Sequence, residues 1–144
     1  MGMESLYQEL ILQHYRSPRN RGVLDSPTAE ISMNNPVCGD EITLQIQVSE
    51  GVVEAVRFTG QGCSISQASA SMMAHQLEGK SLAAARELAE KFTRLLHGDA
   101  SLAGDAALGD LRALAGVSKF PVRVKCALLA WNALNEAEKA LPSQ

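Results

Sequence analysis

The chain has 144 residues, of which 46% are hydrophobic and 20% charged, and its formal net charge is −3. This composition is typical of one globular domain over residues 1–144, and the lack of a lysine- and arginine-rich cluster argues against a nucleic-acid partner. No basic segment followed by an apolar run occurs near the start, and no apolar stretch reaches about 18 residues, so we expect a cytoplasmic protein without a membrane span.

The first part of the chain is predicted to form a helix and a short strand. Over residues 4–15 the apolar side chains of Leu6, Leu10 and Ile11 recur on one helical face, which Tyr7 is expected to share. A segment that contains proline and glycine ends this helix, because neither residue continues a helix at low cost. Residues 29–33 are then expected to form a first strand.

Two longer strands are predicted over residues 41–48 and 53–59, because apolar and polar residues alternate there. The side chains of the first that should point into the core are Ile42, Leu44, Ile46 and Val48. A glycine-containing turn over residues 49–51 separates the two strands and indicates an antiparallel hairpin.

The second half of the chain changes to a helical pattern. Helices are expected over residues 66–77, 82–97 and 121–140, the second capped by a serine and the last beginning at a proline. Residues 98–109 are rich in glycine and alanine, and we predict a mobile loop there, followed by a short helical turn over residues 110–114.

Candidate functional residues cluster around the three cysteines, Cys38, Cys63 and Cys126. An odd number of cysteines in a cytosolic protein argues against a disulfide framework, so we expect reduced thiols. Cys38 belongs to a Cys-Gly-Asp motif in which Gly39 allows a sharp turn, so that the thiol and the carboxylate of Asp40 can converge on one ion. An ordinary loop cysteine beside a surface aspartate is the plain alternative.

The other two cysteines are expected near the starts of helices. Cys63 follows a Gly-Gln-Gly turn, where the positive end of a helix dipole favours the thiolate. Cys126 lies one turn into the last helix, and the charges of Arg123 and Lys125 are expected to lower its pKa and to attract an anionic sulfur species. The plain alternatives are a phosphate-binding turn or a simple strand–helix corner for Cys63, and a buried core cysteine for Cys126. Considered together, the three thiols and Asp40 instead predict one tetrahedral metal site.

These motifs together resemble the NifU N-terminal/IscU/SufU family of iron–sulfur cluster assembly proteins, and the resemblance covers almost the whole chain. The segments that carry it are His14-Tyr15-Arg16-Ser17-Pro18-Arg19-Asn20, Asn35-Pro36-Val37-Cys38-Gly39-Asp40, Thr59-Gly60-Gln61-Gly62-Cys63-Ser64 and Pro121-Val122-Arg123-Val124-Lys125-Cys126. Lys125 stands where the IscU branch is expected to have histidine, and residues 98–116 contain an apparent insertion, so the chain is more similar to the SufU branch. The family implies an α+β fold, the SufE/NifU-like fold, with a three-stranded antiparallel sheet packed against helices.

The resemblance to the SufU branch implies a zinc ion on Cys38, Asp40, Cys63 and Cys126. It further implies that the protein accepts sulfur from a SufS-type cysteine desulfurase, activates that enzyme, and serves downstream Suf cluster-assembly proteins. Cys38 is expected to receive the sulfur, because its glycine-containing loop can move. Arg123 is expected to dock or steer the anionic donor without binding metal, since arginine stays protonated.

Two alternatives remain open. The same residues could assemble a 2Fe–2S cluster, which would make the protein a scaffold, or a zinc ion could serve folding alone. A colourless protein with one equivalent of zinc would favour sulfur transfer or a structural site, and a brown protein would favour the scaffold.

Overall fold

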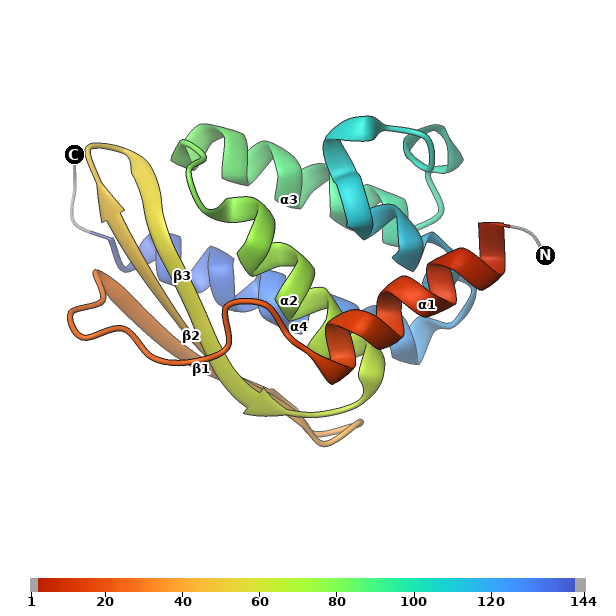
Figure 1. Cartoon of the computed structure of the whole chain (residues 1–144), viewed down its shortest axis with the longest axis horizontal. Coiled ribbons are helices and arrows are strands. Elements are labelled where there is room, and N and C mark those ends of the chain that lie inside the picture. The colour runs from red at the N-terminus through yellow and green to blue at the C-terminus, as the bar shows by residue number, and fades with distance from the viewer. Residues whose placement is uncertain (1–2, 142–144) are drawn as a thin grey trace.

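The computed structural model of the protein describes residues 3–141, in which one helix precedes a sheet and further helices follow it (Figure 1). The elements are α1 (Met3–Arg16), β1 (Ala29–Asn35), β2 (Asp40–Ser49), β3 (Val52–Gln61), α2 (Ser64–Leu77), α3 (Leu82–Leu96), the 3-10 helices η1 (Ala100–Leu102) and η2 (Ala106–Lys119), and α4 (Pro121–Lys139). Over this range no helix has the length and apolar character that crossing a membrane requires. The predicted α+β class is confirmed.

The three strands form an antiparallel sheet in the order β1-β2-β3. Because side chains alternate along each strand, one face of the sheet is buried, and it carries Ile42, Leu44, Ile46, Val56 and Phe58. Between β2 and β3 the chain turns within two residues, Glu50 and Gly51, whose φ values of 51° and 74° suit a tight hairpin. The predicted hairpin and its inward side chains are therefore confirmed.

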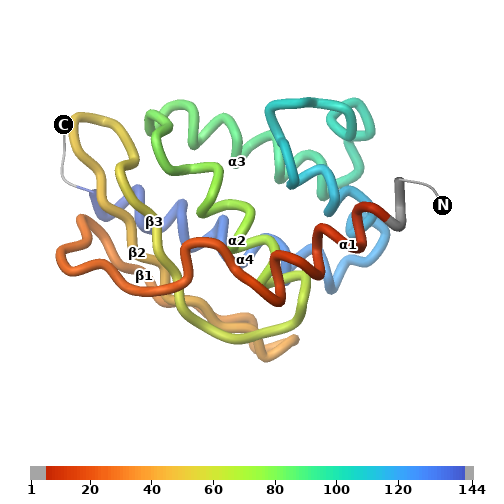
Figure 2. Tube along the Cα trace, in the orientation of Figure 1, coloured from red at the N-terminus to blue at the C-terminus, as the bar shows by residue number. Residues whose placement is uncertain are grey.

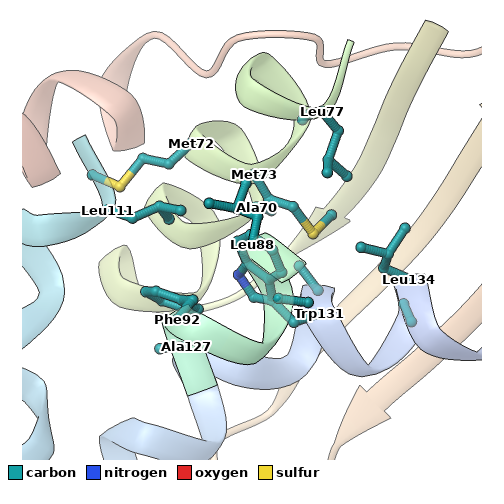
Figure 3. Close-up of a cluster of buried hydrophobic side chains, with 14 of the residues drawn as sticks. Ala70, Met72, Met73, Leu77, Leu88, Phe92, Leu111, Ala127, Trp131 and Leu134 are labelled. Carbon is teal, nitrogen blue, oxygen red and sulfur yellow. The ribbon is translucent and has the colours of Figure 1, made fainter. Parts of the chain in front are cut away.

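Helices α2 and α4 pack on the sheet, α2 beside β3 and α4 across β1 and β2 (Figure 1). At the contact between the two helices, the Ser69 hydroxyl donates to the carbonyl of Ala127 (2.6 Å) and accepts from the indole N–H of Trp131 (3.1 Å). The Trp131 ring lies 4.9 Å from the Phe92 ring of α3, inside the apolar cluster of Figure 3. This packing fixes the position of α4, and with it Cys126.

The segment predicted to be a mobile loop, residues 98–109, forms η1 and the first part of η2, so that prediction is wrong. A kink at Gly109 (φ 53°, ψ −131°) divides η2, and the helical part after it begins at Asp110, as predicted, but continues to Lys119 beyond the short turn predicted over 110–114. The buried residues of η2 recur every three positions, which is the repeat of a 3-10 helix. They include Leu108, Leu111, Leu114 and Val117. Figure 2 traces this segment from the end of α3 to the start of α4.

Helix α1 buries the predicted stripe with the exception of Leu6. Leu10 and Ile11 pack against the core together with Tyr7, whereas Leu6 is 57% exposed. A 3.6-residue period places Leu6 about 100° around the helix from Tyr7, and the core contacts the side that carries Tyr7. The prediction for Leu6 is therefore wrong.

The buried side of α1 also carries His14, which joins three helices. Its Nε2 donates to Asp110 of η2 (3.0 Å), because a carboxylate only accepts, and its Nδ1 then accepts from the hydroxyl of Ser71 in α2 (2.7 Å). The same hydroxyl oxygen accepts from the backbone N–H of Arg19 (2.7 Å). Side-chain hydrogen bonds thus tie α1, α2 and η2 together.

Asp110→Ala is expected to lower the free energy of unfolding by about 1 kcal/mol, because the buried Nε2–H of His14 loses its acceptor. The loss stays modest, since Asp110 is half exposed and water can take the place of its carboxylate. Urea unfolding followed by circular dichroism measures the change. Asp25→Ala, at an exposed aspartate of the segment before β1, is the control. Equal stability of the two variants would contradict the prediction.

Candidate metal centre

The turn between β1 and β2 carries the first cysteine. The N–H groups of Cys38 and Gly39 both donate to the carbonyl of Asn35, at 3.2 and 2.9 Å, which closes the turn. Gly39 has a φ of 71°, so the sharp turn expected at this glycine is confirmed. Asp40 begins β2 directly after the turn and pairs with Asn35 across the strands.

The other two cysteines reach the same end of the sheet from β3 and α4. Because β2 and β3 are antiparallel with Glu41 opposite Gln61, the end of β3 lies beside the start of β2. Cys63 follows as the N-cap residue of α2, which confirms the predicted helix start. Cys126 lies in the first part of α4 and is buried.

Three of the four predicted ligands converge in space. The donor atoms of Cys38, Asp40 and Cys126 all lie within 4.8 Å of one another, and the two sulfur atoms are 2.9 Å apart. The thiol of Cys63 is not part of this group. Cys63 contacts it through the main chain, where its N–H donates to Oδ1 of Asp40 at 2.9 Å, and its side chain acts on the thiol of Cys126.

The surroundings of the Asp40 carboxylate indicate whether these residues suit a cation. Asp40 is 1% exposed, and its Oδ2 is buried without a hydrogen-bond partner among the described residues. A buried carboxylate oxygen without a partner is costly, whereas a cation shared with the two thiols would satisfy it. Thiolate and carboxylate donors in this combination suit zinc. The residues therefore fit a zinc ion.

Burial determines the protonation of Cys126. Desolvation by burial, followed by the side chains of Cys38, Asp40 and Cys63 around the sulfur, raises the pKa of the Cys126 thiol. The expectation that the cations of α4 lower this pKa is therefore wrong, because burial and neighbouring acidic groups outweigh the exposed cations. Positive charge supplied inside the site would act against this rise.

Arg123 lies beside two of the thiols, on the solvent side. Attraction to the sulfur of Cys63 and hydrogen bonding to it, with smaller contributions from Cys126, raise the pKa of the guanidinium. The side chain is exposed. Its position one helical turn before Cys126 therefore brings a permanent positive charge to the rim of the site.

Comparison with known proteins places this site in a family. Residues 6–127 match the model of the NifU-like N terminal domain. The chain belongs to this family. The zinc-dependent sulfurtransferase SufU of Bacillus subtilis is 44% identical over 134 residues, which cover 93% of this chain and 90% of that protein. The iron–sulfur cluster assembly scaffold protein IscU of Streptococcus pyogenes serotype M1 is 43% identical over 137 residues, with coverage of 95% and 85%.

Solved structures of NifU-like proteins agree with this assignment. FiSufU from the thermophile Fervidobacterium islandicum AW-1 aligns with a TM-score of 0.84 and 31% identity, covering 94% of this chain and 98% of that one. A NifU-like protein (N-terminal) from Brucella abortus aligns with a TM-score of 0.84 over 96% and 95%, and at 23% identity it shows the shared fold. The predicted family and fold are confirmed.

One contact that supports the NifU-like site was not predicted from the sequence. Arg21, in the segment after α1, donates through its guanidinium to the carbonyl of Gly60 (2.8 Å) and to the side chain of Gln67 (3.3 Å). It thereby holds the glycine turn that leads into Cys63. No local pattern signals this contact, because Arg21 and Gly60 are 39 positions apart.

An apolar surface borders the site, and this too was not predicted. Val37, Phe120 and Val122, which are near the cysteines in sequence, are each more than half exposed. A groove of about 600 Å³ runs along α1, η2 and the start of α4. Its lining includes Tyr7, Ile11, Ile65, Val117 and Phe120, together with the cations Lys119 and Arg123.

Proposed function

We propose that the chain is a zinc-dependent sulfur-transfer protein of the cytoplasm. It accepts persulfide sulfur from a SufS-type cysteine desulfurase and supplies downstream Suf cluster-assembly proteins. The observation that carries the proposal is the buried Oδ2 of Asp40, which has no hydrogen-bond partner within residues 3–141 although two thiols lie beside it. The similarity to the zinc-dependent sulfurtransferase SufU of Bacillus subtilis supports the choice of metal and reaction.

Cys38, Asp40, Cys63 and Cys126 would hold the zinc ion. Zinc is redox-inert, takes tetrahedral sulfur and oxygen ligands, and keeps the thiols it binds deprotonated near neutral pH. Its charge would offset the burial that raises the pKa of Cys126. Cys63 would complete the set from the start of α2, where the helix dipole favours a thiolate.

Sulfur transfer is an exchange between a thiolate and a persulfide. The thiolate of Cys38 attacks the terminal sulfur of the donor's cysteine persulfide and forms a new S–S bond to it. The donor's own S–S bond breaks, and its cysteine leaves with the electron pair as a thiolate, so no external oxidant or reductant is consumed. Cys38 suits this role because it is partly exposed in a turn, whereas Cys126 is buried in a helix.

The apolar surface beside the site supports a protein as the sulfur donor. Exposed apolar side chains such as Phe120 and Val122 become buried when a partner covers them, and this contributes to binding. The cations Lys119 and Arg123 of the neighbouring groove would face acidic groups of that partner. The donor's persulfide would then be presented from the side on which Cys38 is accessible.

A second candidate function is a scaffold for a 2Fe–2S cluster on the same residues, which the similarity to IscU of Streptococcus pyogenes favours. Lys125, next to Cys126, offers no further soft ligand for iron. One experiment separates the candidates: purified protein is analysed for metal and then added to a SufS-type desulfurase. Zinc with faster turnover supports sulfur transfer, and a brown, iron-containing protein supports the scaffold. Zinc without any effect on turnover supports a structural site.

Arg123→Ala is expected to slow sulfur acceptance about tenfold while the zinc content stays at the wild-type level. The guanidinium lies beside the thiols and can attract an anionic persulfide, but it cannot bind metal because it stays protonated. Initial rates of transfer from a persulfide-loaded desulfurase, at low and high salt, measure the effect. Lys139→Ala removes an exposed cation from the far end of the same helix and should change the rate little. Zinc loss or an unchanged rate in Arg123→Ala would contradict the assignment.

A further inference from the structure

Gly62, the residue before Cys63, lies directly against the side chain of Asp40. A Cβ atom added to Gly62 would lie 3.0 Å from Cγ and 3.1 Å from Cβ of Asp40, and closer still to Oδ1. Contacts this close force the neighbouring side chain to move. The φ of Gly62 is not positive, so its backbone would accept any residue. The glycine is needed here for space, not for conformational freedom.

The two oxygens of the Asp40 carboxylate differ in their surroundings. Oδ1, the atom nearest to the missing Cβ, accepts the N–H of Cys63 at 2.9 Å. Oδ2 is buried and has no hydrogen-bond partner in the described part of the chain. One oxygen is therefore anchored to the start of α2, and the other is left available beside the thiols of Cys38 and Cys126.

We propose that Gly62 is a positioning residue for Asp40. Its missing side chain admits the carboxylate to the N–H of Cys63, which anchors Oδ1 and leaves Oδ2 as the single oxygen donor of the metal site. The inference rests on the proposed zinc site for the role of Oδ2. The contact between Gly62 and Asp40 is itself independent of the metal.

The neighbouring glycine of the same motif has a different task. A Cβ on Gly60 would meet the backbone of Glu41 and lie 2.9 Å from Cα of Ile42, and its φ is 146°. Gly60 therefore permits the close pairing of β2 and β3, and its replacement should disturb the sheet as a whole. Of these two glycines, only Gly62 faces a side-chain atom of Asp40, so Gly62→Ala should displace the carboxylate selectively.

The test compares Gly62→Ala, Asp40→Ala and the double variant, each as the full-length protein as purified. Gly104→Ala is the matched control, because a Cβ there meets no described atom within 4 Å. Two readouts are used: the amide proton resonance of Cys63 by NMR, and the absorption spectrum after replacement of the metal by cobalt(II). We expect Gly62→Ala to move the Cys63 amide upfield and to change the cobalt spectrum in the same direction as Asp40→Ala. Sulfur acceptance should fall more than metal content in both variants.

The double variant provides the decisive comparison. In the Asp40→Ala background the carboxylate is absent, so adding Gly62→Ala should change neither readout further. Independent, additive effects, or a Gly62→Ala protein with the wild-type amide resonance, would overturn the proposal. If Gly62→Ala alone fails to fold, folding of the double variant supports the proposal and its failure to fold refutes it. A wild-type protein that binds no zinc would defeat the proposed function, yet the Cys63 amide would still report on Gly62 and Asp40.

Discussion

Cys126→Ala is expected to weaken zinc binding by more than about 100-fold, because even outer-shell partners of a metal site contribute about 10–100-fold. The variant removes a donor that lies 2.9 Å from the sulfur of Cys38 and within 4.8 Å of the Asp40 carboxylate. With that thiol gone, the remaining donors no longer enclose the ion. Competition with a chromogenic chelator measures the change in affinity.

The control for this variant is Val124→Ala, a second truncation of a buried side chain in the same helix. Val124 is not a metal donor, so this variant should retain wild-type affinity for zinc even if α4 packs less well. Full zinc content and unchanged affinity in Cys126→Ala would show that the cysteine belongs to the core alone. Equal loss in both variants would indicate that helix packing, and not ligation, sets the affinity.

Transferred sulfur is expected on Cys38 and on no other cysteine of the chain. Cys38 lies in a turn closed by two hydrogen bonds to Asn35, so its side chain can move without unravelling a helix. Moving Cys126 would disturb the packing around Trp131, where buried apolar area contributes about 25 cal/mol per Å². Cys63 is the N-cap residue of α2, so moving it would disturb the start of that helix.

The experiment mixes the protein with a persulfide-loaded desulfurase, traps the products by alkylation and maps the modified cysteine by mass spectrometry. Cys38→Ala should then carry no added sulfur, while Val37→Ala, which changes the exposed neighbour of Cys38, should still accept it. Added sulfur on Cys63 or Cys126 with Cys38 unmodified would overturn the assignment of the acceptor. It would leave the proposed zinc site untouched.

Short-range signals in the sequence are sufficient to predict most of this fold. The serine at position 81 caps α3 by accepting from the N–H of Ala84, and Pro121 begins α4, as their types suggest. Alternation identifies β2 and β3, and the glycine between them indicates the hairpin. These features depend on neighbours within a few positions, which is why a single sequence reveals them.

The errors arise where distant contacts or an uncommon repeat decide the structure. Leucines spaced by three in η2 fit a 3-10 helix, whereas glycine and alanine nearby suggest a loop. Burial raises the pKa of Cys126, whereas the adjacent cations in the sequence suggest that this pKa is lowered. The space that Gly62 leaves for Asp40 and the support that Arg21 gives to Gly60 both cross between separate elements. Periodicity carries no information about such contacts.

The position of Cys126 in α4 affects the stage of folding at which the proposed metal site can select its ion. Cys38 and Cys126 are 88 positions apart, so a growing chain exposes the first thiols long before the last one is made. Until α4 has packed on the sheet, the earlier residues offer an incomplete and flexible set of donors, which binds divalent ions weakly and with little selectivity. In the proposed zinc site, selection of the ion would thereby be deferred to the finished fold. A metal ion bound by the unfinished chain on the ribosome would remain in the site only if it stayed bound while α4 packed on the sheet.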